Sequence, residues 1–196
     1  LRHIETIAGR VEVVDGATGT LEDSYFHDYL ASDPAIIHTL GNPHRVTLNL
    51  RRCYVARYHE VLSQLATNHI EGCLLEYQDY SGDGIDLDAG QRGSYIRRCT
   101  LRRGKIFNTD ALDLGEYGGT GELTRGVLVE SCLLHDFIDK GVSMGVSVDA
   151  TVTNCLIYNV DAGVAVKDNS VADIYNTTIA AATYGYHCYN KANSAA

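Results

Sequence analysis

A six-residue pattern recurs seven times along this chain and limits its fold more than any other feature. Each copy has an apolar residue, a small and weakly polar residue three positions later, and a second apolar residue two positions further on. Neighbouring copies lie between 20 residues (Cys53 to Cys73) and 33 residues (Cys99 to Cys132) apart, which is a solenoid spacing. The small polar positions are Ser24, Cys53, Cys73, Cys99, Cys132, Cys155 and Thr177.

A second pattern follows five of these copies and has the alternation of a β-strand. It starts with a small residue. The positions that follow alternate between apolar or thiol side chains, expected to point into the core, and other side chains, expected to point outward. The leading small residues are Gly84, Ala111, Gly141, Gly163 and Gly185. One such unit cannot bury its own apolar face, whereas stacked units can.

We therefore predict an all-β fold, a right-handed parallel β-helix of about seven coils with at least two strands in each coil. Residues 1–196 are expected to form one domain, with 1–20 as an incomplete coil or cap and 190–196 as a tail. Because the chain starts at Leu1 without Met, we interpret it as a fragment or a processed form.

Charge and hydropathy exclude some functions. The chain has 16 Lys plus Arg and 25 Asp plus Glu, a net charge of −9, and so lacks the basic footprint of a nucleic-acid binder. It contains no apolar run long enough to span a membrane. Five of its six cysteines share one column of the repeat, so we predict buried free thiols rather than disulfides, with Cys188 inside as well.

Acidic side chains cluster on two neighbouring coils of the second pattern. Asp86 and Asp88 are expected one coil from Asp113 and Glu116, close enough to repel each other. Three explanations stay open: a Ca²⁺ ion bound by these four carboxylates, raised pKa values suited to acid and base catalysis, or aspartates that only cap turns. Lys140 and Lys167 lie one and two coils further on, so Asp113, Lys140 and Lys167 are the candidate catalytic residues.

Four residues, of which Asp86 is also a candidate metal ligand, are candidates for binding a substrate. Asp86 and His187 share the outward column of the second pattern with Asp113. Arg102 and Arg103 belong to a basic stretch on another side of the coil, where guanidinium groups suit carboxylate or sulfate. The alternative is a solvated face on which these arginines pair with glutamates. Outward tyrosines suit either sugar stacking or simple coverage of a sheet.

Three segments carry a resemblance to known proteins: residues 110–116, 139–145 and 163–170. They resemble right-handed parallel β-helix repeat proteins of bacteria in the pectate-lyase-like superfamily, most of all the β-helix regions of secreted proteins with CotH-kinase-like and lamin-tail domains. The resemblance implies the fold and an extracellular or cell-surface setting, and little about activity. Asn108-Thr109-Asp110 also resembles the first motif of polygalacturonase-type glycoside hydrolases, but the Gly-His-Gly and Arg-x-Lys motifs that those enzymes carry further along the chain do not follow it in this sequence.

The sequence thus predicts an extracellular module that contacts acidic polysaccharide on the outer side of the second strand set, with Ca²⁺ as the candidate cofactor. Catalysis stays open. One alternative is a polysaccharide lyase, in which the superfamily resemblance implies Lys140 or Lys167 as the base, or a glycoside hydrolase. Another is a purely structural or adhesive scaffold, and self-association is compatible with each of them.

Overall fold

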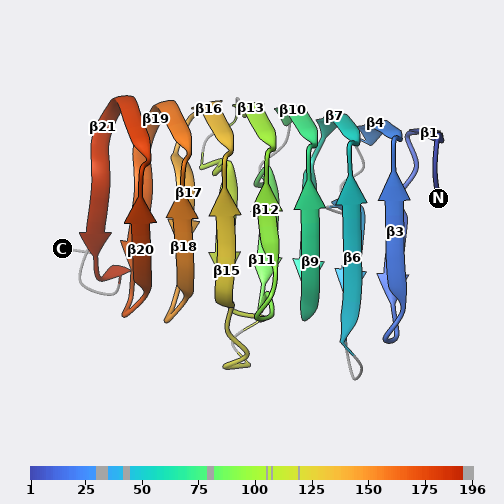
Figure 1. The fold of residues 1–196 in the computed structure, drawn as a ribbon, viewed down its shortest axis with the longest axis horizontal. Coiled ribbons are helices and arrows are strands. Elements are labelled where there is room, and N and C mark those ends of the chain that lie inside the picture. The colour runs from blue at the N-terminus through green and yellow to red at the C-terminus, as the bar shows by residue number, and fades with distance from the viewer. Residues whose placement is uncertain are drawn as a thin grey trace.

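A computed structural model of the chain describes residues 1–29, 35–41, 45–78, 82–104, 106, 108–118 and 120–191. The chain winds as a right-handed parallel β-solenoid of about seven coils, as predicted. Figure 1 shows the coils stacked in sequence order, from the blue N-terminal coil to the red C-terminal coil. No helix in this part of the chain is long and apolar enough to cross a membrane.

Each coil has three strands, which stack into three faces. Face 1 contains β3 (Thr18–Glu22), β6 (Val46–Arg51), β9 (Ala66–Glu71), β12 (Tyr95–Arg97), β15 (Arg125–Glu130), β18 (Asp149–Thr153) and β20 (Val171–Tyr175). Face 2 contains β1 (Glu5–Ile7), β4 (Tyr25–Tyr29), β7 (Tyr54–Tyr58), β10 (Leu74–Gln78), β13 (Thr100–Gly104), β16 (Leu133–Phe137) and the first halves of β19 (Leu156–Lys167) and β21 (Thr178–Tyr189).

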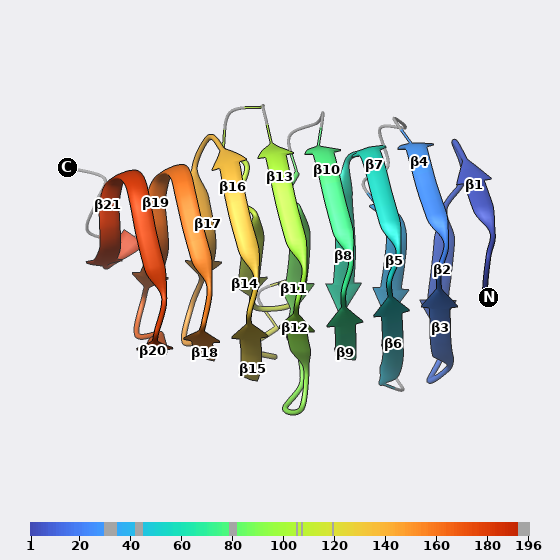
Figure 2. The same cartoon turned by 45° about the horizontal axis from the view of Figure 1, so that its top comes forward.

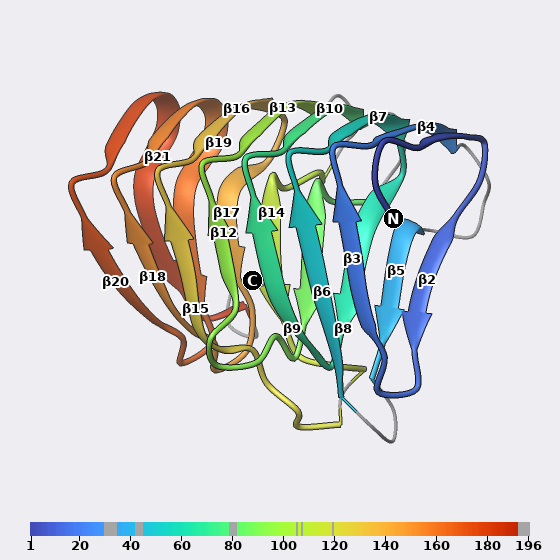
Figure 3. The same ribbon diagram turned by 45° about the vertical axis from the view of Figure 1, so that its right-hand side comes forward.

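Face 3 contains β2 (Val11–Val14), β5 (Ala35–Leu40), β8 (Glu60–Gln64), β11 (Ile85–Asp88), β14 (Leu112–Gly115), β17 (Lys140–Met144) and the second halves of β19 and β21. Figure 2 shows the strands of face 2 side by side, and Figure 3 shows face 1 in front of face 3. Strands β1, β2 and the start of β3 fall within residues 1–20, and residues 192–196 of the predicted tail lie outside the described residues.

The core consists of columns of apolar side chains, each of which occupies the same position in successive coils. The second apolar column of the repeat is fully buried in six coils: Phe26, Val55, Leu75, Leu101, Leu134 and Ile157. Face 1 and face 3 contribute equivalent columns. The column of face 1 includes Leu50, Ile70 and Ile96. Burying such side chains is the main stabilising contribution that a solenoid has, because each coil contacts only its neighbours.

A sharp corner joins face 1 to face 2 in every coil. The corner residue has a backbone φ between +47° and +63° in all eight of its occurrences, His3, Asp23, Arg52, Gly72, Arg98, Ser131, Asn154 and Asn176. In the seven coils after the first of these corners, the small polar residue of the repeat follows the corner residue directly. In five coils its thiol donates to the carbonyl oxygen two residues earlier at 3.2–3.4 Å.

The small polar column also accepts hydrogen bonds from the neighbouring coil. The backbone N–H of Cys53 donates to Cys73 Sγ at 3.4 Å, and that of Cys73 donates to Cys99 Sγ at 3.5 Å. Ser24 and Thr177 make the equivalent bonds through oxygen. The position therefore requires a small side chain that both donates and accepts, which is why Ser, Cys and Thr occupy it.

The cysteines of this column are free and buried, as predicted. The prediction that Cys188 is inside is wrong, since Cys188 is exposed. It lies on β21, and no described coil lies beyond β21 to cover it.

The two-way hydrogen bonding of this column predicts a graded response at Cys99. Cys99→Val removes the acceptor for the buried N–H of Cys73 and should lower the free energy of unfolding by about 1–3 kcal/mol. Cys99→Ser keeps both hydrogen bonds and should cost clearly less. Urea unfolding of the two variants and the wild type measures this, and a valine variant at least as stable as the serine variant would contradict it.

Candidate functional site

A polar cavity of about 360 Å³ opens on face 3 toward the C-terminal end of the solenoid. We call it the acidic cavity. Four residues singled out from the sequence line it together: Asp113 on β14, Lys140 on β17, Lys167 on β19 and His187 on β21. Five aspartates and three lysines contribute to its lining.

The register of face 3 explains why these residues meet. Asp86, Asp113, Ser143, Ala165 and His187 are paired in successive strands, so they form the outward column that the sequence predicts. Between Asp113 and His187, this column contains only the small side chains of Ser143 and Ala165. Lys167 extends into this region, where its Nζ donates to Ser143 Oγ at 2.7 Å.

A second column, one bend earlier, supplies carboxyl groups that the sequence reasoning did not select. Asp83 Oδ1 accepts the backbone N–H of Asp110 at 2.7 Å, and Asp110 Oδ1 accepts the backbone N–H of Lys140 at 2.9 Å. Lys140 Nζ lies 3.4 Å from Asp110 Oδ1 and also pairs with Asp139. The available signal was the aspartate before the leading small residue in two consecutive coils.

Burial and neighbouring charges shift the pKa values of the carboxyl groups and of Lys140 in the cavity. Burial and the neighbouring charges of Asp113 and Asp110 raise the pKa of Asp83 to about 8. Burial also raises the pKa of Asp110 to about 6, against the attraction of Lys140. Burial disfavours the charge of Lys140, but Asp110 and Asp139 outweigh it and raise the pKa of that ammonium group. Lys140 therefore remains a cation that can hold a negative charge, which makes it unsuitable as a general base.

Lys167 is a buried cation without a carboxylate partner. Its residue is 8 % exposed, and none of the carboxylates in the described part of the chain forms an ion pair with it. Taking a charge out of water without a counter-charge is costly, so this end of the cavity favours an anionic group.

The rings of His187 and Tyr189 line one side of the cavity, and Tyr184 lies beside His187 outside the lining. The His187 ring stacks on Tyr184 with centroids 4.3 Å apart and lies 4.4 Å from the Tyr189 ring. All three residues belong to β21, and Tyr184 is 46 % exposed. We call this group the aromatic rim. It places a half-exposed flat surface beside charged and hydrogen-bonding groups.

The predicted metal ligands are arranged differently. Asp86 lies opposite Asp113, but Asp86, Asp88 and Glu116 do not line the acidic cavity. Asp88 accepts a hydrogen bond from Gln64 at 3.0 Å, and Glu116 forms an isolated antiparallel bridge with Leu123. Over the ranges that the structure describes, no group of three His, Cys, Asp or Glu residues is placed to hold a metal ion.

Two of the four predicted ligands, Asp86 and Asp88, favour the protonated form. Burial, together with nearby carboxylates, raises the pKa of Asp86 and of Asp88. Asp86 Oδ1 and Asp113 Oδ1 are buried and accept no hydrogen bond from any described residue. The Ca²⁺ site stays a prediction.

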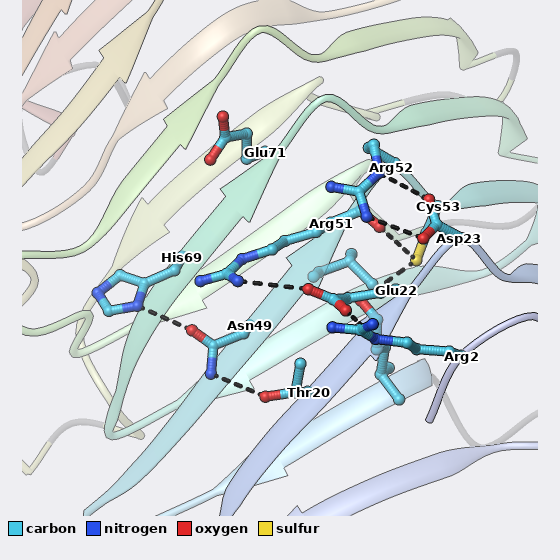
Figure 4. A network of polar contacts seen from close by, with 12 residues as sticks. Arg2, Thr20, Glu22, Asp23, Asn49, Arg51, Arg52, Cys53, His69 and Glu71 are labelled. Atoms are coloured by element: carbon cyan, nitrogen blue, oxygen red, sulfur yellow. Dashed lines mark hydrogen bonds and ion pairs between the residues drawn. The ribbon is translucent and has the colours of Figure 1, made fainter.

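Arg102 and Arg103 do not reach the cavity. Both belong to β13 on face 2, where they pair with Glu76 at 2.7 and 3.3 Å. The same holds for other arginines: Figure 4 shows Arg51 bound to Glu22 and Arg52 bound to Asp23. Along face 1 the charges alternate from coil to coil in the order Arg2, Glu22, Arg51, Glu71, Arg97 and Glu130. The arginines thus stabilise the stacking of coils, which was the alternative interpretation.

Comparison with known proteins agrees with this architecture. Residues 38–195 match a family described as "Right handed beta helix region". Comparisons with curated proteins and with solved structures gave no significant match. The more specific likeness to regions beside CotH-kinase-like and lamin-tail domains stays a prediction. Because the match covers most of the sequence and the structure has the corresponding fold, the chain belongs to the right-handed β-helix family.

Proposed function

We propose that this chain is an extracellular module that binds a carboxylate-bearing polysaccharide in the acidic cavity. The observation that carries the proposal is the convergence of Asp113, Lys140, Lys167 and His187, from four consecutive turns of face 3, on one cavity beside the aromatic rim. Concave sites with a few convergent polar groups are the usual places where proteins bind small units of a ligand.

Each group has a role that its chemistry supports. Asp83, which is protonated at neutral pH, donates a hydrogen bond to a sugar hydroxyl, while Asp113 accepts one. Lys167 pairs with the ligand carboxylate, which supplies the missing counter-charge. The exposed ring of Tyr184, which stacks on His187 at the edge of the cavity, covers the apolar face of a sugar. Arg102 and Arg103, already paired with Glu76, take no part.

Hydrolysis is the catalytic alternative that the cavity favours over β-elimination. A glycoside hydrolase needs one protonated and one ionised carboxyl group near the scissile bond. Asp83 has a pKa of about 8 and suits the acid, which would give its proton to the leaving oxygen. Asp113 would take a proton from the attacking water. A lyase needs an unprotonated base, and the raised pKa of Lys140 works against that role.

The test is the binding of polygalacturonate and of neutral galactan, measured by calorimetry on the wild type and three variants. We expect Lys167→Met to weaken polygalacturonate binding at least about tenfold, or ~1.4 kcal/mol, with little effect on galactan. Asp113→Asn should weaken the binding of both polymers. Arg102→Gln is the control and should bind like the wild type.

Two outcomes would reject the site. One is unchanged binding in Lys167→Met and Asp113→Asn, and the other is a loss confined to Arg102→Gln. The same mixtures report on chemistry: new reducing ends that disappear in Asp83→Asn indicate hydrolysis, and unsaturated uronates indicate elimination. A protein that binds neither polymer nor other glycans would be a structural scaffold.

A further inference from the structure

The acidic cavity continues around the corner between face 3 and face 2. A middle hollow of about 270 Å³ shares three lining residues with it, namely Asn108, Asp139 and Asp161. An outer hollow of about 310 Å³ follows and shares Ile138 with the middle hollow. Because neighbouring hollows have common walls, they lie side by side along the described residues of this corner, and we call the three together the groove.

The outer part of the groove differs in chemistry from the acidic cavity. Ile138 lies between β16 and β17 with 48 % of its surface exposed, and it forms a wall of both the middle and the outer hollow. Beside it, Asn159 donates a side-chain hydrogen bond to Asp136. An aliphatic wall next to hydrogen-bonding groups suits a ring with an apolar face and a polar edge.

The corner that carries the groove is rigidly built. Gly104 lies opposite Phe137, and a Cβ atom at position 104 would come within 2.2 Å of the Phe137 ring. Asp136 and Asn159 occupy equivalent corner positions with φ of +59° and +56°. Phe137 is 3 % exposed, so the floor of the outer hollow is fixed by core packing. A site that is already formed loses little conformational entropy when a ligand binds.

Size indicates how much ligand the groove accepts. Each hollow is near the lower limit, about 300 Å³, of pockets that hold a small molecule. A monomer would fill one hollow and leave two empty, whereas a chain of linked rings would fill all three.

We propose, on the basis of the proposed function, that the ligand is a linear oligosaccharide of at least three units. Its first unit occupies the acidic cavity, and the following units pass through the middle hollow to the outer hollow. Ile138 is the residue that senses chain length, because it contacts only the units beyond the first.

The experiment measures affinity against chain length. Galacturonic acid and its oligomers from dimer to hexamer are titrated into the wild type, Ile138→Ser, Ile138→Leu and Val146→Ser. Val146 is the matched control, since it is 45 % exposed and lines none of the three hollows. Thermal unfolding of each variant verifies that it is folded.

We expect affinity to rise at least tenfold from monomer to trimer or tetramer and then to level off. Ile138→Ser should remove most of this gain and leave the affinity for the monomer within twofold of the wild type. Ile138→Leu and Val146→Ser should behave like the wild type.

The proposal is overturned if affinity does not depend on chain length, or if Ile138→Ser weakens monomer and tetramer equally. It is also overturned if Val146→Ser loses the same gain. In those cases the monomer still binds and the proposed function stands. Absence of binding by the monomer and by every oligomer, together with galactan, would reject the proposed function itself and the groove with it.

Discussion

Lowering the pH from 8 to 5 should stabilise this protein, because buried carboxyl groups on face 3 hold their protons more tightly in the folded state. The pKa of Asp83 is raised from 3.8 to about 8 and that of Asp110 to about 6. The unfolded chain releases these protons above about pH 4, whereas the folded chain keeps them. The stabilisation is therefore complete below the unfolded pKa and is lost as the pH rises through the folded pKa.

The expected change is large. One pKa unit corresponds to about 1.4 kcal/mol, so Asp83 alone should change the free energy of unfolding by on the order of 3–5 kcal/mol between its two limits. Much of that change falls between pH 5 and pH 8. Urea unfolding at several pH values measures it directly.

Asp83→Asn isolates this group from the other titrating side chains. The asparagine keeps a carbonyl oxygen that can accept the N–H of Asp110, but it carries no charge facing Glu60, Asp110 and Asp113. We expect the variant to be more stable than the wild type at pH 8, about equal to it at pH 5, and flatter in between. A variant with the same pH dependence as the wild type would contradict the assignment.

Gly141→Val should be among the most damaging single substitutions on face 3. A Cβ atom at position 141 would lie 2.4 Å from Ile157 Cγ2 and 2.7 Å from the carbonyl oxygen of Gly163. Ile157 is fully buried and Gly163 is backbone of the next coil, so neither can move freely. We expect the free energy of unfolding to fall by about 3 kcal/mol or more, which thermal unfolding would record as a melting temperature lower by about 10 °C.

The same column provides a matched control at Gly185. A Cβ atom there would meet no described atom within 4 Å, so Gly185→Val should change stability by no more than about 0.5 kcal/mol. Ala111 occupies this column in another coil and shows that one methyl group is tolerated there, which is why valine is the sharper probe. Equal losses in the two valine variants would show that steric contact is not the reason for these glycines.

The sequence repeat predicts the solenoid correctly but hides one of its corners. The pattern from Leu50 to Val55 looks like one strand, yet it contains the end of β6, a turn, and the start of β7. The turn residue in this coil is Arg52 at φ +51°, and glycine occupies the position only at Gly72. No Gly or Pro marks the corner in most coils, because hydrogen bonds to the next residue and the neighbouring coil hold it. The sequence pattern for this reason predicts at least two strands in each coil, and the structure has three.

The sequence predicts the residues of the candidate site that strand register aligns in one column. It does not identify the residues whose importance comes from burial in the folded chain. Asp113 and His187 share a column that strand alternation alone identifies. Asp83 and Asp110 precede the leading small residues and resemble ordinary turn aspartates in the sequence. Only the three-dimensional contacts show that Asp110 is buried against Lys140. Arg102 and Arg103 lie on face 2, which agrees with their expected position on another side of the coil from the aspartates.

We propose that polysaccharide binds this protein in the acidic cavity of face 3. Amide chemical shifts, followed by NMR during titration with trigalacturonate, test it most directly because they locate the contact. We expect shifts centred on Ser143, Lys167 and His187, which saturate together and are absent in Lys167→Met. Shifts centred on Arg102 and Arg103, with the face 3 amides unmoved, would contradict it.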